Sequence, residues 1–184
     1  MALIDLAEGF RNHKEKIVDL WVDYTLSTYT SSKFFKSEQD RFANPVGSNV
    51  RDALTKLFDL LSKGEDSETY KEPLDQFISI RSVQQLTPSQ ALAPINAVKH
   101  ITRDVFKKDK ERSHIAEELY DFEFNVDLAV LAGFDIYMGY RERLYQVRIN
   151  EIKSGNHLLT DSKCPSRLLN DDNMQETITK VTSN

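Results

Sequence analysis

The side chains of this sequence that could do chemistry are a few histidines and single charges within apolar runs. His100 lies about three turns into a helix predicted to begin at Thr87 and Pro88, where a sensor protein could hold a haem iron. An axial ligand must face an apolar pocket, but at about 100° per residue His100 falls opposite the apolar face, beside Asn96 and Arg103. We therefore predict that His100 points to solvent and that the protein has no cofactor.

The other reactive side chains form no recognisable catalytic or metal-binding pattern. The remaining histidines lie in charged or polar surroundings, and the single cysteine lies in the polar segment "DSKCPSR". These residues are His13, His114, His157 and Cys164. The sequence has no G-x-S-x-G, no glycine-rich phosphate loop and no H-E-x-x-H motif. We therefore predict no catalytic residue, no metal site and no enzyme activity.

Charges also occur within apolar runs: Arg81 in "FISIRSVQQL", and Asp127 and Asp135 in "FNVDLAVLAGFDIYMGYRERLY". Such a charge must be paired or kept in contact with water, because burying it alone is strongly unfavourable. We predict that Arg81 pairs with Asp135 or Glu142 and fixes a short helix against the last one. The alternative is a polar pocket for a small signal or a partner's side chain. The residues of such a ligand- or partner-binding site are Arg81, Gln84, Gln85, Asp135, Arg141 and Glu142.

Arginines alternate with glutamates towards the end of the last predicted helix. Arg141, Arg143 and Arg148 lie near Glu142 and Glu151 in the sequence. Spacings of three and four residues between opposite charges are typical of a solvated helix face. A surface that docks a partner protein is the alternative.

The composition excludes two classes of partner. Hydrophobic residues make up 40% of the 184 residues, and the net charge is −5. Binding by phosphate neutralisation needs a clustered basic face, so we predict no nucleic-acid partner. The sequence has no apolar run of about 18 residues and no basic segment followed by an apolar core at its N-terminus. We therefore predict a cytoplasmic protein without membrane insertion.

Apolar residues recur at helical spacing through residues 1–154, whereas strand-like alternation is almost absent. The predicted fold class is all-α, a single domain of about five to six helices that ends in a long helix. Asn44 before a proline and Gly64 after a lysine predict the two ends of one helix. Residues 155–184 are predicted to form a flexible polar tail. The predicted helices cover Leu3–Tyr29, Pro45–Lys63, Glu72–Gln84, a segment that begins at Pro88, and Ser113–Lys153.

The last helix is apolar on nearly every side at its middle, so more than one surface should cover it. One side can pack on the protein's own core and another on a second copy, because Ala129 and Gly133 allow close approach of two backbones. We predict a homodimer; the alternative is that helices of the same chain cover both sides. The predicted dimer interface consists of Phe122, Val126, Ala129, Gly133, Ile136 and Tyr140.

Three segments resemble a known family when taken in order: "DRFANPVGSNVRDALTKLFDLL", "IRSVQQLTPSQAL" and "LAGFDIYMGYRERLYQVRINEIK". They are similar to the N-terminal domain of RsbRD-type proteins, co-antagonists of the RsbT kinase in bacterial stressosomes. The resemblance covers roughly residues 15–154.

This resemblance implies a sensor or input domain for signalling in stress-response regulation, and an unidentified protein partner or small signal. It also implies a relation to the non-haem, globin-like domains that dimerise through a long terminal helix. In the family a STAS domain usually follows, whereas here only residues 155–184 follow. Two alternatives remain: a haem- or cofactor-binding globin-like sensor, and an accessory subunit of a redox complex in an anaerobic bacterium.

Overall fold

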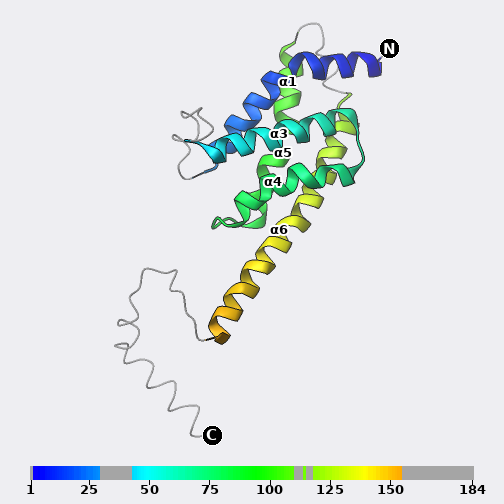
Figure 1. Ribbon diagram of the computed structural model, residues 1–184. Helices are drawn as coiled ribbons and strands as arrows, with labels where there is room; N and C mark the ends of the chain where they lie inside the picture. The colour runs from blue at the N-terminus through cyan, green and yellow to red at the C-terminus, as the bar shows by residue number, and fades with distance from the viewer. Residues whose placement is uncertain (1, 30–42, 110–113, 115–117, 155–184) are drawn as a thin grey trace, which may run out of the picture. The chain divides into compact units, whose positions relative to one another are not determined.

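The structure is a computed structural model that describes residues 2–29, 43–109, 114 and 118–154 (Figure 1). Within these residues the chain forms five α-helices and one short 3-10 helix, and no strand. The predicted all-α fold class and the long C-terminal helix are thereby confirmed. The elements are α1 (Ala2–Ser27), α3 (Pro45–Lys63), η1 (Ser67–Tyr70), α4 (Lys71–Ser82), α5 (Pro88–Lys108) and α6 (Tyr120–Ser154).

The ends of α3 and the start of α5 lie where the local signals predict them. The Asn44 side chain accepts a hydrogen bond from the Gly47 amide at 2.8 Å, and Gly64 ends α3 in the left-handed conformation with φ 67°. Thr87 and Gln90 form the complete capping box of α5. The predicted ends of α3 and the predicted start of α5 are thereby confirmed.

Helix α6 begins at Tyr120 rather than at the predicted Ser113, which itself lies outside the described residues. Glu118 and Leu119 are not helical, and the Leu119 carbonyl accepts the first helical bond, from the Glu123 amide at 2.8 Å. No proline, glycine or capping side chain marks this start, so the sequence did not reveal it. The predicted tail also lies outside the described residues.

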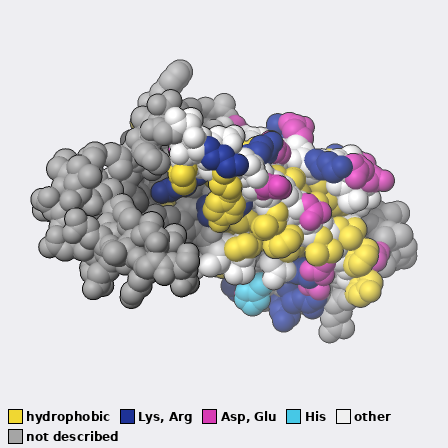
Figure 2. Space-filling view, turned by 90° about the horizontal axis from the view of Figure 1, so that it is seen from below, with side chains coloured by type: hydrophobic (Ala, Val, Ile, Leu, Met, Phe, Trp, Pro, Cys, Tyr) yellow, Lys and Arg dark blue, Asp and Glu magenta, His cyan; other side chains and the backbone are white. Residues whose placement is uncertain are grey.

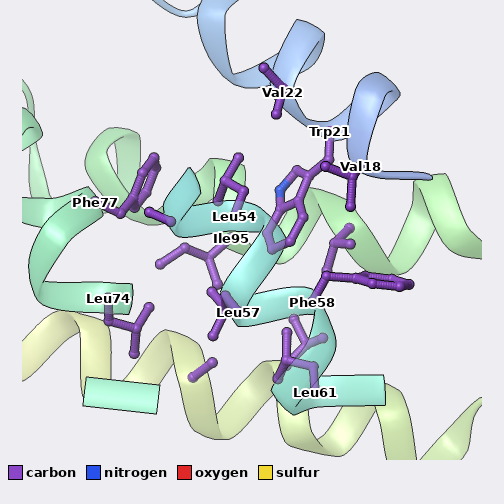
Figure 3. Packing of buried hydrophobic residues seen from close by; sticks show 14 of the residues in the cluster. Val18, Trp21, Val22, Leu54, Leu57, Phe58, Leu61, Leu74, Phe77 and Ile95 are labelled. Carbon is purple, nitrogen blue, oxygen red and sulfur yellow. The ribbon is translucent and has the colours of Figure 1, made fainter. Parts of the chain in front are cut away.

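The core forms where the apolar faces of α1, α3, α4 and α5 meet. Helix α1 packs against α3 and α5, and α3 packs against α4. Trp21 is fully buried, and its indole nitrogen donates a hydrogen bond to the Pro94 carbonyl at 2.6 Å. Figure 3 shows how side chains from different helices interdigitate; they include Val18, Val22, Leu54, Leu57, Phe58, Leu61, Leu74, Phe77 and Ile95.

The chain divides into two compact units, Met1–Glu142 and Arg143–Asn184. The first unit holds the core and the first part of α6. The described part of the second unit is the remainder of α6, in which several large hydrophobic side chains are exposed. No helix among the described residues is long and apolar enough to cross a membrane. The predicted division at residues 154 and 155 stays a prediction.

Candidate functional site

Arg81, the most prominent predicted site residue, is completely buried at the end of α4. Its Nε and Nη2 atoms donate to the Ala91 and Gln90 carbonyls, each at 2.9 Å. Its Nη1 atom donates to the Thr28 hydroxyl at 3.0 Å. Arg81 therefore connects the end of α4 with the start of α5 and the end of α1.

Pro94 explains why a carbonyl of α5 is available to Arg81. Pro94 lies within α5 and has no amide N–H, so the carbonyl four residues earlier, that of Gln90, lacks its α-helical donor. A partly buried carbonyl that lacks a donor is destabilising. Arg81 supplies the missing hydrogen bond from another helix.

The predicted ion pair of Arg81 with Asp135 or Glu142 is not formed. Both carboxylates are exposed, and among the described residues no acidic side chain forms an ion pair with Arg81. Neutral oxygens surround the guanidinium, and its carbon lies 5.1 Å from the ring centre of Tyr29 and 5.6 Å from that of Phe77. Hydrogen bonds and aromatic faces thus replace the expected carboxylate.

The turn between α4 and α5, residues 83–87, brings part of the predicted binding site together. The Arg141 Nη1 atom donates to the Ser82 carbonyl at 3.3 Å, and the side-chain amide nitrogen (Nε2) of Gln84 donates to the Ile80 carbonyl at 3.2 Å. Gln85 is exposed in the same turn.

Sequence reasoning missed Tyr137, whose hydroxyl donates to the Leu86 carbonyl at 2.7 Å. Its side chain is only 1% exposed, and it ties the α4–α5 turn to α6. No signal in the sequence marks a tyrosine that bonds to a main-chain carbonyl. Pro94, by contrast, was a readable signal, because a proline within a helix always removes one donor.

The histidines do not form a ligand site in the described part of the chain. The His100 side chain is 81% exposed and lies 3.3 Å from Asp104, which confirms that it points to solvent. His13 Nε2 lies 2.8 Å from Asp109 Oδ2, and His114 is exposed. No group of three His, Cys, Asp or Glu side chains that could hold a metal occurs in the described residues. His157 and Cys164 lie outside them.

One face of α6 packs on the chain's own core, and it contains the residues that we predicted for a dimer. A Cβ atom added at Gly133 would lie 3.1 Å from side-chain carbons of Ile78 and Leu92. The close backbone approach that this glycine allows is therefore made to α4 and α5 of the same chain. Of the predicted interface residues, Phe122, Val126, Ala129 and Gly133 are buried here, and Ile136 and Tyr140 are half-buried.

Ion pairs fix α6 along α5. Lys99 Nζ lies 2.7 Å from Asp127, and the Arg103 guanidinium donates to Glu123 Oε1 at 2.5 and 3.0 Å. The aspartate at position 127 within the apolar run is thus both paired and in contact with solvent, since its side chain is 55% exposed.

Large hydrophobic side chains remain exposed in the first unit on another face of α6, which we call the outer face (Figure 2). The outer face consists of Phe124, Leu131, Phe134 and Met138, whose side chains are 52%, 64%, 44% and 44% exposed. A groove of about 610 Å³ lies between α5 and α6 and reaches this face at Phe134. Its other lining residues are Pro88, Ser89, Leu92, Ala93, Asn96, Asp127 and Val130.

A comparison with protein families matches residues 15–152 to the RsbT co-antagonist protein rsbRD N-terminal domain. The chain belongs to this family. The resemblance that the three sequence segments suggested is therefore confirmed, and the RsbRD N-terminal domain spans the described helices from within α1 to near the end of α6. No curated protein and no solved structure matches the chain.

Proposed function

We propose that this RsbRD-type domain is a non-enzymatic, cytoplasmic sensory or regulatory module that works as a homodimer through the outer face of α6. Membership of the family supports a role as a sensory input domain of the stressosome type. The observation that carries the proposal is the outer face itself, since its four large hydrophobic side chains lie close together in the first unit and are exposed among the described residues.

The spacing of the exposed residues supports pairing of α6 with another helix. Phe124, Leu131 and Met138 recur every seventh residue, the repeat of helices that associate side by side. In the second unit, Tyr145 and Ile152 continue the same spacing in the sequence and are also exposed. A second copy of α6 presents the same apolar stripe and would cover it.

The experiment is light scattering of the full-length chain and of two matched variants. Leu131→Glu places a charge on the outer face, whereas Leu20→Glu places one at a 47% exposed leucine of α1. We expect dimers for the wild type and for Leu20→Glu, and monomers for Leu131→Glu, because an unpaired charge in an apolar interface is unfavourable. A monomeric wild type, or a dimeric Leu131→Glu variant, would contradict the proposal.

The α4–α5 turn is the place that we propose for a small signal or a partner's side chain. Val83 is 69% exposed there, and Gln84, Gln85 and Arg141 provide donors and acceptors around it. Asp135 and Glu142 are exposed on α6, and we propose their carboxylates as the acidic groups of the same binding site. Binding at the turn would be signalled by protection of its amides from hydrogen exchange in the presence of the cell's small-molecule extract. No protection relative to buffer would contradict this assignment.

A further inference from the structure

We propose that Arg81 is a positioning residue that replaces the hydrogen bond removed by Pro94 and thereby couples the end of α1 to α6 through the α4–α5 turn. The inference rests on the proposed function in one respect, since it names the path by which an input domain would pass a change to α6. Its structural part stands on contacts within the first unit alone.

The first step is the hydrogen bond that is missing from α5. Pro94 leaves the Gln90 carbonyl without its α-helical donor, and Arg81 donates to that oxygen at 2.9 Å. The neighbouring Ala91 carbonyl accepts the Nε–H of Arg81 at 2.9 Å. The first turns of α5 are therefore held by a side chain of α4 as well as by their own helical bonds.

The second step is the attachment of α1 at the same place. The third donor of Arg81 reaches the Thr28 hydroxyl at 3.0 Å, just after the end of α1. Trp21 of α1 donates to the carbonyl of Pro94 itself at 2.6 Å. Arg81 and Trp21 thus connect the end of α1 to the part of α5 around Pro94. Because hydrogen bonds are directional, a shift of one helix should displace the other.

The third step leads from the turn to α6. The buried Tyr137 hydroxyl donates to the Leu86 carbonyl at 2.7 Å, one residue before the cap of α5. Arg141 donates to the Ser82 carbonyl at the other end of the turn, at 3.3 Å. The acceptors of both bonds are main-chain oxygens. The bonds therefore restrain the backbone of the turn itself.

Elsewhere in the first unit, α6 meets the core through apolar side chains and the close approach at Gly133, and its polar contacts there, such as Arg103 with Glu123 and Tyr140 with Asp75, join side chain to side chain. Apolar contacts are not directional and allow small sliding movements. At the α4–α5 turn and the start of α5, by contrast, side chains of α4 and α6 bond to main-chain oxygens, and Arg81 also reaches Thr28 after α1. Arg81 lies in the last turn of α4, just before this turn, and is completely buried, which suits a coupling role better than direct contact with a ligand.

The test is hydrogen exchange, measured by mass spectrometry, on the full-length chain and four variants. These are Arg81→Met, Pro94→Ala, the double variant, and Lys56→Met as the control. Lys56 Nζ lies 2.9 Å from Glu72 Oε1 on the exposed surface. The control therefore also replaces a cation that has a partner with methionine. We expect Arg81→Met to raise exchange about tenfold at the start of α5 and around Tyr137, and the control to leave both segments unchanged.

The double variant decides whether Arg81 replaces the bond that Pro94 removes. In the Pro94→Ala background, the new amide N–H at position 94 can donate to Gln90, so Arg81→Met should raise exchange at the start of α5 by less than about threefold. An equal rise in both backgrounds would overturn the replacement. A rise confined to α4 and α5, with α6 unchanged, would overturn the coupling.

Tyr137→Phe keeps the proposal testable if Arg81→Met does not fold, because it removes one hydroxyl and keeps the ring. We expect faster exchange in residues 83–87 and in the surrounding part of α6, with α3 unchanged. No increase in the turn would overturn the path to α6. Repeating the measurement in the Leu131→Glu variant separates this inference from the dimer: the same pattern should persist there, whether or not the wild type is a dimer.

Discussion

The two faces of α6 contain similar apolar side chains but have different surroundings. The inner face, with Phe122 and Gly133, is buried against helices of the same chain, whereas the outer face, with Phe124 and Leu131, is exposed. The inner face has glycine and alanine at the points of closest approach, and the outer face has large side chains. The small residue Gly133 therefore lies where this helix packs on its own chain, and the large residues of the outer face lie on an exposed surface.

Two phenylalanines two residues apart give the strongest test of this difference. Phe122 is 3% exposed and Phe124 is 52% exposed. We expect Phe122→Ala to lower the free energy of unfolding by about 3–5 kcal/mol, because it leaves a cavity in the core. Phe124→Ala should lower the same free energy by less than about 1 kcal/mol at concentrations where the chain is monomeric.

Urea unfolding followed by circular dichroism measures both variants. Equal losses of stability would contradict the assignment of the two faces.

Two glycines of α6 test the close approach. At Gly133 an added Cβ would press on Ile78 and Leu92 at 3.1 Å, whereas at Gly139 it would meet nothing within 4 Å. We expect Gly133→Ala to destabilise the protein by about 1–3 kcal/mol through overpacking. Gly139→Ala should stabilise it by about 0.5–1 kcal/mol, because alanine loses less backbone freedom in a helix.

Thermal unfolding of the two variants provides the measurement, since the transition temperatures should move in opposite directions. If Gly133→Ala instead abolished the dimer and left the stability of the monomer unchanged, Gly133 would belong to the dimer interface, as predicted from the sequence.

The ion pairs at the edge between the two faces should have a smaller effect. Glu123 is half-buried and receives two hydrogen bonds from Arg103. Glu123→Gln keeps the shape and removes the charge, so we expect a loss of about 0.5–1 kcal/mol that shrinks at high salt.

Denaturant titrations at low and high salt check this expectation. A loss that does not depend on salt would show that the contact acts through packing rather than through charge.

Local signals in the sequence were sufficient for much of the fold. Asn44, Gly64 and Thr87 determine helix ends through hydrogen bonds to residues close in the chain, and these ends were predicted correctly. The start of α6 at Tyr120 was missed because no cap or breaker marks it. The outward direction of His100 followed from helical periodicity alone.

The partners of distant residues could not be predicted in the same way. Periodicity shows that α6 is apolar on several sides, but only the neighbours of Gly133 show which side meets the core. A buried arginine predicts a carboxylate partner, but two of the acceptors of Arg81 are the main-chain oxygens of Gln90 and Ala91. Main-chain acceptors leave no signal in the residue types of a sequence, except where a proline removes their helical donor. Pro94 marked one of these acceptors in the sequence, but only the structure brings Arg81 to it.

The most direct test of the central claim, that the outer face of α6 is an interface between two copies, is sedimentation equilibrium of the full-length wild type beside Leu131→Glu. We expect twice the chain mass of 21.2 kDa for the wild type at micromolar concentration. For Leu131→Glu we expect the mass of a single chain, with unfolding unchanged at concentrations where both are monomers. A single-chain mass for the wild type, or a dimer that persists in the variant, would contradict this claim.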